Sequence, residues 1–185
     1  MGNTKSVAII TGASQGIGRA AAIRLARDFS AIVLAARDKD NLETTATEVR
    51  SLGAEAMAFS LDLRQPQSAK SIIEGTLERF GRIDALLNIA GAVPQIDLFQ
   101  MTDAQWDDGM ALKLNGARRL TIEAWDALKA SNGSVVFMSG SAAFAPSPDM
   151  PQSRRSTLPL THSPRHSQSK ELKTEFRSTA YRLGQ

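Results

Sequence analysis

The sequence predicts an α/β protein built on a doubly wound parallel sheet. Through the first 140 residues, short apolar runs alternate with amphipathic stretches. Continuous apolar runs are typical of strands covered on both faces, and amphipathic stretches are typical of the helices that cover them. A glycine-rich turn joins the first run to the first amphipathic stretch, as is common at the start of a βα unit.

Five apolar runs predict five strands. The first run, SVAIIT, and the second, AIVLAA, contain no charged residue, as expected for strands buried in a parallel sheet. Because helical stretches separate the runs, we expect parallel strands joined by crossover helices. The predicted strands are Ser6–Thr11, Ala31–Ala36, Glu55–Leu61, Asp84–Ile89 and Ser134–Ser139.

Capping residues and glycines mark the ends of the predicted helices. Asp, Asn and Thr side chains accept hydrogen bonds from free N–H groups at helix starts, and glycine commonly follows a helix end. Asp38, Asp40 and Asn41 can cap the second helix, and Thr102 can cap the fourth. The predicted helices run from about Ile17 to Asp28, from the Asp38–Asn41 cap to Leu52 before Gly53, from Gln67 to Phe80 before Gly81, and from Thr102 to about Ala130 before Gly133.

The composition changes near Met150. Residues 151–185 hold both histidines and the only tyrosine, and neither the helical nor the strand period persists there. We therefore predict one domain over residues 1–150 and an irregular segment over residues 151–185. His162 and His166 have a metal-like spacing, but Pro164 between them breaks the helix that such a site needs, so no metal site is predicted.

Composition also excludes several classes of function. Residues 1–150 hold 15 basic and 17 acidic residues, whereas residues 151–185 hold 7 and 2, so the net charge of +3 comes from the last segment. The body therefore offers no cationic surface for nucleic acid. The chain has no cysteine, no signal-peptide pattern and no apolar stretch long enough for a membrane helix. We expect a cytoplasmic protein that binds neither nucleic acid nor membrane.

The glycine-rich turn TGASQGIG carries the main functional signal. It lies between the first predicted strand and the first predicted helix, where Gly12, Gly16 and Gly18 leave room for a tight turn, for pyrophosphate and for close helix–strand packing. The free N–H groups of the helix start favour a phosphate. A glycine-rich turn without a ligand is the alternative, and the position of the motif directly after a buried strand argues against it.

At these residues the sequence resembles the short-chain dehydrogenase/reductase family. TGASQGIG matches the family pattern TGxxxGIG, Asp62-Leu63 matches the family's adenine-contacting residues, and Asn88-Ile89-Ala90-Gly91 matches NNAG except at Ile89. The resemblance covers roughly residues 6–150 and implies a Rossmann-type fold that binds NAD(P). The residues that it assigns to the cofactor are Gly12, Ser14, Gln15, Gly16, Ile17, Gly18, Asp62, Leu63, Asn88, Ala90 and Gly91.

The residues after the second strand predict which dinucleotide binds. An acidic side chain there would hydrogen-bond the ribose diol of NAD and repel a 2′-phosphate. The chain has Ala36 and then Arg37 at this point, so a guanidinium is available for the phosphate. We predict NADP(H) in preference to NAD(H), with Arg37 as a further cofactor residue. The alternative is an ordinary solvated arginine.

The resemblance also implies hydride transfer assisted by a Ser-Tyr-Lys-Asn set, and most of this set is altered. Ser141 is the preferred candidate for the serine, with Ser139 as the other candidate. Lys113 stands where the family has asparagine. No Tyr-x-x-x-Lys pattern exists, because Tyr181 is followed four residues later by Gln185. A tyrosine near its free pKa of about 10 is a poor base at neutral pH, so an incomplete set predicts impaired catalysis.

The final segment resembles a shifted reading of the family's last third. In the shifted frame, each codon consists of the last base of one original codon and the first two bases of the next. From Arg154 onward, a peptide compatible with this frame ends in RVPVNCLSPGP. This ending is similar to the family's RVNxxxPG strand and loop. We therefore interpret the chain as a divergent member that is truncated or frameshifted near codon 150, with its C-terminal strands missing. Ser134–Ser139 would then be an apolar edge strand at risk of aggregation.

Two functions follow from the sequence. The first is an NADP(H)-dependent oxidoreductase that transfers hydride to or from a small carbonyl or alcohol substrate, with impaired activity in this chain. The second is a non-catalytic NADP(H)-binding protein. The resemblance also implies a homo-oligomer, a state that loss of the last helix would weaken.

Overall fold

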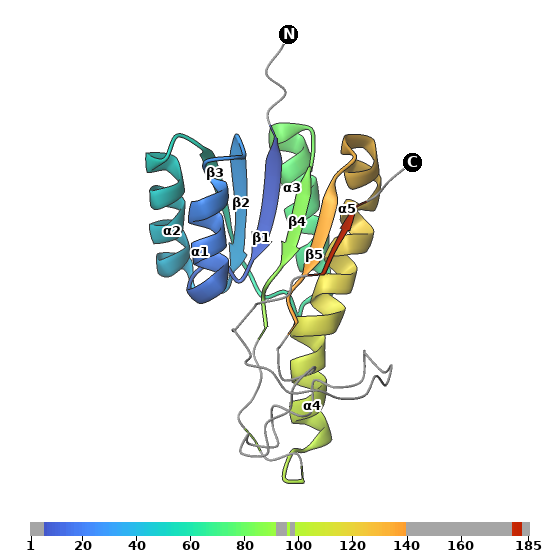
Figure 1. Ribbon diagram of the computed structural model, residues 1–185. Helices are drawn as coiled ribbons and strands as arrows, with labels where there is room; N and C mark the ends of the chain where they lie inside the picture. The colour runs from blue at the N-terminus through green and yellow to red at the C-terminus, as the bar shows by residue number, and fades with distance from the viewer. Residues whose placement is uncertain (1–5, 92–95, 97–98, 140–178, 183–185) are drawn as a thin grey trace, which may run out of the picture.

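The computed structural model describes residues 6–91, 96, 99–139 and 179–182, and in this part of the chain a sheet is covered by helices on both faces (Figure 1). The strands are β1 Val7–Thr11, β2 Ala31–Ala36, β3 Glu55–Ser60, β4 Ala85–Asn88, β5 Ser134–Phe137 and β6 Thr179–Arg182. The helices are α1 Gly16–Leu25, α2 Lys39–Ser51, α3 Pro66–Phe80, α4 Asp103–Met110, a π-helical turn η1 Ala111–Gly116, and α5 Ala117–Ser131.

The strand order is β3-β2-β1-β4-β5-β6, and β1 to β5 are parallel. The chain builds outward from β1 through β2 to β3, then returns to the other side of β1 for β4 and β5. The order therefore reverses between β1 and β4, which is the topological switch point of a doubly wound sheet. The predicted fold class and all five predicted strands are confirmed.

Alternate residues of each strand face opposite layers of the core. Val7 and Ile9 of β1 pack toward α3 and α5, whereas Ala8 and Ile10 pack toward α1 and α2. All four side chains are fully buried. The sheet therefore has no wet face over β1 and β2, which explains why their sequences are continuously apolar rather than alternating.

Side-chain caps begin two of the helices, and residues with left-handed backbone conformations end two of them. Asp38 accepts a hydrogen bond from the Asn41 backbone N–H at 3.0 Å, and this bond lowers the pKa of the Asp38 carboxyl. Thr102 and Gln105 form a reciprocal capping box at the start of α4. Gly81, with φ of +71°, ends α3, and Asn132, with φ of +52°, ends α5.

The predicted helix from Thr102 to about Ala130 is interrupted by a turn that the sequence did not reveal. The structure divides this stretch into α4, η1 and α5, with the π-helical turn at Ala111–Gly116. Such turns occur mostly as single insertions within α-helices, frequently at functional sites. Its sequence ALKLNG ends in an Asn-Gly pair, which is a turn signal, but contains no pattern that specifies a π-helical turn.

Of residues 151–185, which the sequence predicts to be irregular, the structure describes only a four-residue strand. Residues Thr179–Arg182 form β6, which pairs antiparallel with β5 in the register Ser134↔Arg182 to Phe137↔Thr179. β5 was expected to be an open edge strand, and in this structure it is not. The physical reason is that an unpaired strand edge presents free N–H and C=O groups to any extended segment that reaches it.

The core on the α5 side supports a direct test of packing. Leu120 is fully buried, whereas Ile122 on the same helix is 56% exposed. We expect Leu120→Ala to lower the free energy of unfolding by about 3 kcal/mol, through lost apolar burial and a cavity. Ile122→Ala should change it by less than about 0.5 kcal/mol. Urea unfolding of both variants checks this, and equal losses would contradict the assigned core.

Candidate cofactor site

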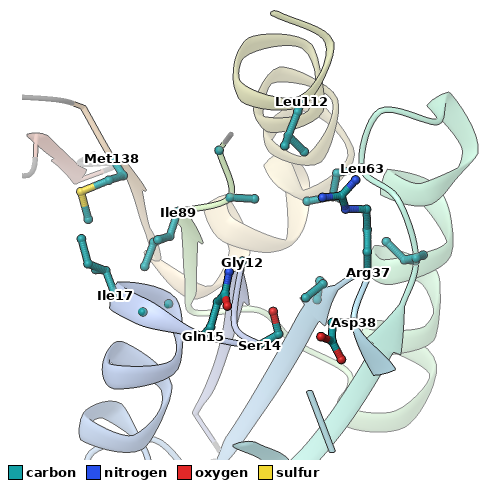
Figure 2. Close-up of a pocket in the computed structure, with 17 residues that line it drawn as sticks. Gly12, Ser14, Gln15, Ile17, Arg37, Asp38, Leu63, Ile89, Leu112 and Met138 are labelled. Carbon is teal, nitrogen blue, oxygen red and sulfur yellow. The ribbon is translucent and has the colours of Figure 1, made fainter. Parts of the chain in front are cut away.

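A pocket of about 770 Å³ opens at the carboxyl ends of the parallel strands (Figure 2). It spans the switch point between β1 and β4, where open α/β sheets bind their ligands. Residues from the turns after β1, β2, β3, β4 and β5 line it, together with η1. The lining residues are Gly12, Ser14, Gln15, Gly16, Ile17, Gly18, Ala35, Ala36, Arg37, Asp38, Leu61, Leu63, Ile89, Ala90, Gly91, Leu112 and Met138.

The turn after β1 requires glycine for reasons that the structure makes explicit. Gly12 has φ of +68°, and a Cβ there would lie 3.0 Å from the Cα of Ala90. A Cβ on Gly18 would lie 2.2 Å from the carbonyl oxygen of Gly12. The turn therefore folds tightly back on the start of α1, and only residues without a side chain permit this packing.

The start of α1 is free to receive an anion. Its capping residue, Gln15, makes no side-chain hydrogen bond to the helix, and the first turn contains no acidic residue. The first N–H groups of a helix have no intrahelical acceptor, and the helix dipole favours negative charge at this end. Gly16, with φ of +56°, leaves open space at the same point. The site therefore fits the phosphates of a dinucleotide.

The hydroxyl of Thr11 joins the two strand ends that flank the switch point. Its Oγ1 accepts hydrogen bonds from the backbone N–H groups of Ile89 and Ala90, both at 3.0 Å, and donates to the carbonyl of Leu87 at 3.3 Å. Thr11 thus holds the turn after β4 against the glycine turn. The sequence prediction did not identify this role, because it depends on a contact across 78 residues.

The end of β2 presents both a cation and an anion to the pocket. Figure 2 shows the Arg37 side chain reaching toward Leu63, with Asp38 below it. Asp38 was not expected in the site, because the prediction considered only the residue directly after the strand. Its carboxylate caps α2, accepting hydrogen bonds from the Asn41 backbone N–H at 3.0 Å and Nδ2 at 2.6 Å. These bonds direct the charge of Asp38 toward α2.

Two predicted cofactor residues do not line the pocket. The carboxylate of Asp62 instead accepts two hydrogen bonds from Arg64. The backbone N–H of Arg64 donates at 3.0 Å, and Nη1 of Arg64 donates at 3.4 Å. Asn88 is buried, and its Nδ2 donates to Oγ1 of Thr121 at 3.4 Å, while its Oδ1 has no partner among the described residues. The other ten predicted residues do line the pocket: Gly12, Ser14, Gln15, Gly16, Ile17, Gly18, Arg37, Leu63, Ala90 and Gly91.

The two ends of the pocket differ in chemistry. Ile17, Ile89 and Met138 lie close together at one end, and Ser14, Arg37 and Asp38 lie toward the other (Figure 2). Ile89 replaces the second asparagine of the NNAG pattern, so its side chain adds to the apolar end. A pocket with one charged end, a phosphate-compatible centre and an apolar end matches the chemical order of an extended dinucleotide.

Lys113 lies on η1, close to the turn after β4. A Cβ on Gly91 would lie 3.5 Å from Cδ of Lys113, so the lysine methylenes cover this glycine. The neighbouring Leu112 is buried and lines the pocket. The π-helical turn therefore brings the residue that replaces the family's asparagine to the border of the site. Ser141, the predicted catalytic serine, lies outside the described residues.

Some lining residues could have been found from the sequence and others could not. A rule that ligands bind beyond the carboxyl ends of strands would have found the residues at the ends of β2, β3 and β5. Leu112 needed the tertiary packing of η1, for which no sequence signal exists. The lining residues missed are Ala35, Ala36, Asp38, Leu61, Ile89, Leu112 and Met138.

The part of the chain that the structure describes contains neither a candidate metal site nor a candidate membrane span. Among residues 6–91, 96, 99–139 and 179–182, His, Cys, Asp and Glu nowhere gather in a group of three that could hold a metal ion. Among the same residues, no helix is both long and apolar enough to span a membrane.

Comparison with known proteins identifies the family. The sequence model described as short chain dehydrogenase matches residues 6–152. The chain belongs to the short-chain dehydrogenase family, whose members are oxidoreductases, and its fold matches solved structures of that family.

Individual relatives show the range of cofactors among similar proteins. The short-chain reductase protein NovJ of Streptomyces niveus is 35% identical over 115 residues, covering 62% of this chain and 44% of that protein. L-sorbose reductase from Gluconobacter frateurii, complexed with NADPH and L-sorbose, has a TM-score of 0.76 at 28% identity, covering 85% of this chain and 60% of that one. An NAD⁺-bound xylitol dehydrogenase has a TM-score of 0.74 at 25% identity, covering 84% and 61%.

The matched region is only part of these relatives. The chain spans between 42% and 46% of the length of the curated proteins that it matches.

Proposed function

We propose that the pocket binds NADP(H) in preference to NAD(H). The observation that carries this proposal is the order of groups along the pocket: Arg37 at one end, the free start of α1 at the centre, and the apolar end beyond it. Similar proteins include both NADPH-bound and NAD⁺-bound examples, so family membership alone does not select between the cofactors. The selection rests on the guanidinium of Arg37, which can form charge-assisted hydrogen bonds to a 2′-phosphate.

Each part of the site has a role in this binding. The amides at the start of α1 and the turn at Gly12–Gly18 receive the pyrophosphate. Leu63 borders the adenosine end, and Ala90 and Gly91 leave room for the middle of the dinucleotide. Ile17, Ile89 and Met138 give an apolar surface to the end that would hold the nicotinamide. When bound there, the cofactor would supply or accept hydride.

The chemistry that we propose is hydride exchange with a small carbonyl or alcohol substrate, at an impaired rate. Lys113 borders the site in the place of the family's asparagine. The chain has no Tyr-x-x-x-Lys pattern that would provide an activated tyrosine as acid or base. General acid–base groups contribute typically about 10²–10⁴-fold to a rate, so a chain lacking this pattern is expected to turn over slowly.

A second candidate function is binding of NADP(H) without chemistry. The phosphate-binding turn, Arg37 and the turn at Ala90–Gly91 all line the pocket, whereas the altered residues are those assigned to catalysis. Binding and catalysis thus depend on different residues. A nucleotide-dependent sensor or partner surface would need only the first group.

The rate of NADPH oxidation over a panel of small aldehydes and ketones separates the two functions. If the chain is an impaired oxidoreductase, we expect slow turnover of at least one carbonyl, and Ser141→Ala should abolish it. Tight NADPH binding with no turnover across the panel would favour the non-catalytic function. Turnover that survives Ser141→Ala would show that the serine assignment is wrong.

A further inference from the structure

Arg64 connects the segment after β3 to α4. Its Nε lies 2.7 Å from Oδ1 of Asp108, and its Nη2 donates a hydrogen bond to Oδ2 of the same residue at 3.0 Å. The Arg64 side chain is 17% exposed and the Asp108 side chain 57% exposed, so the ion pair is only partly screened by water. The hydrogen bond to Asp108 raises the pKa of Arg64, which stays charged.

Further contacts hold the same segment against the continuation of this helix. Nη1 of Arg119, on α5, donates a hydrogen bond to the carbonyl of Arg64 at 3.1 Å. A Cβ on Gly116, the last residue of η1, would lie 3.0 Å from the carbonyl oxygen of Leu63. Leu63 and Arg64 therefore contact the helical stretch from α4 to α5 both before and after the residues that border the pocket.

Within the part of the chain that the structure describes, few contacts tie helix α4 to the domain apart from its continuation into η1. None of its residues is buried, and it extends beyond the end of the sheet (Figure 1). Its capping box, between Thr102 and Gln105, is local. Among the described residues, the contact between Arg64 and Asp108 is the ion pair that joins α4 to the rest of the chain. Because no residue of α4 is buried, loss of this contact would leave the core closed.

The position of α4 matters because the pocket wall follows it directly. Leu112 and Lys113 lie four and five residues after Asp108, which corresponds to roughly 6–8 Å along a helix. Leu112 lines the pocket, and Lys113 covers Gly91. A change in the direction of α4 is therefore transmitted to the pocket within about one helical turn.

We propose that Arg64 is a positioning residue: its ion pair with Asp108 anchors α4, and this anchor holds Leu112 and Lys113 in place for cofactor binding. The proposal rests on the proposed NADP(H) site. Arg64 itself does not line the pocket, since it acts through Asp108 and the helix. Cofactor affinity and the environment of α4 should consequently change together.

The test compares two neighbouring charge removals on the same helix. Asp108→Asn removes the negative charge that pairs with Arg64, whereas Asp107→Asn removes an equal charge from an exposed residue that makes no ion pair among the described residues. Trp106 reports on α4, and Trp125→Phe makes it the only tryptophan, because the chain has two. In this background we expect Asp108→Asn to raise the Kd for NADPH about fivefold and to shift Trp106 emission to the red. Asp107→Asn should change neither.

A conservative variant and the unsubstituted protein make the outcome decisive. Asp108→Glu keeps the charge and should recover most of the NADPH affinity and the Trp106 emission, whereas Arg64→Lys, a second way to weaken the anchor, should behave like Asp108→Asn. Equal NADPH Kd and equal Trp106 emission for Asp108→Asn and Asp107→Asn would overturn the proposed positioning role of Arg64. The proposed function would remain intact. Failure of the unsubstituted protein to bind NADPH would overturn both.

Discussion

Gly18→Val is expected to abolish NADPH binding and to lower the free energy of unfolding by about 3 kcal/mol. A Cβ at this position would lie 2.2 Å from the carbonyl oxygen of Gly12 and 2.6 Å from its carbonyl carbon. These are backbone atoms, so relief requires the turn to move away from α1. The turn is also the part of the site that receives the pyrophosphate. The measurements are NADPH titration and urea unfolding.

Gly81→Ala is the matched control for the effect on stability. Gly81 has φ of +71°, but a Cβ there meets nothing within 4 Å, and the residue lies outside the pocket. We expect a loss of about 1 kcal/mol from backbone strain alone, with unchanged NADPH affinity. If Gly18→Val bound NADPH as the unsubstituted protein does, the assignment of the glycine turn to the cofactor would be wrong.

Arg37→Ala is expected to raise the Kd for NADPH about 30-fold while changing the Kd for NADH less than about twofold. The physical reason is that only NADPH carries the 2′-phosphate with which the guanidinium can form charge-assisted hydrogen bonds. Arg37 has no ion-pair partner among the described residues, so its removal leaves no protein charge unpaired. Parallel titrations with the two dinucleotides measure the effect.

Asp38→Asn tests the same end of the pocket in the opposite direction. Asparagine still caps a helix, so α2 should be preserved while a negative charge near Arg37 is removed. We expect NADPH affinity to rise about threefold, since a nearby carboxylate repels a phosphate.

Equal losses of NADPH and NADH affinity in Arg37→Ala would show that Arg37 does not distinguish the two dinucleotides.

The parts of the fold that the sequence predicted are those set by local patterns. The five parallel strands follow from apolar runs such as SVAIIT, and the helix starts follow from Asp38 and Thr102, whose caps the structure contains. The glycine turn was also predictable from its local spacing, since a Cβ on Gly18 would meet the carbonyl oxygen of Gly12 six residues earlier. Local chemistry alone is enough at such positions.

The parts that the sequence did not predict depend on distant contacts. The carboxylate of Asp62 accepts hydrogen bonds from Arg64, and Nδ2 of Asn88 donates to Oγ1 of Thr121, 33 residues away. The π-helical turn and the pairing of β6 with β5 likewise depend on packing partners that no local pattern specifies. A family pattern therefore located the turns that surround the site but not the direction of every side chain in them.

The central claim is that the pocket selects NADP(H), and direct titration of the unsubstituted protein tests it. NADPH and NADH would each be titrated by calorimetry, with no substrate present. We expect saturable binding of both, with NADPH at least about tenfold tighter because of its 2′-phosphate. Equal or tighter binding of NADH, or no binding of either dinucleotide, would contradict it.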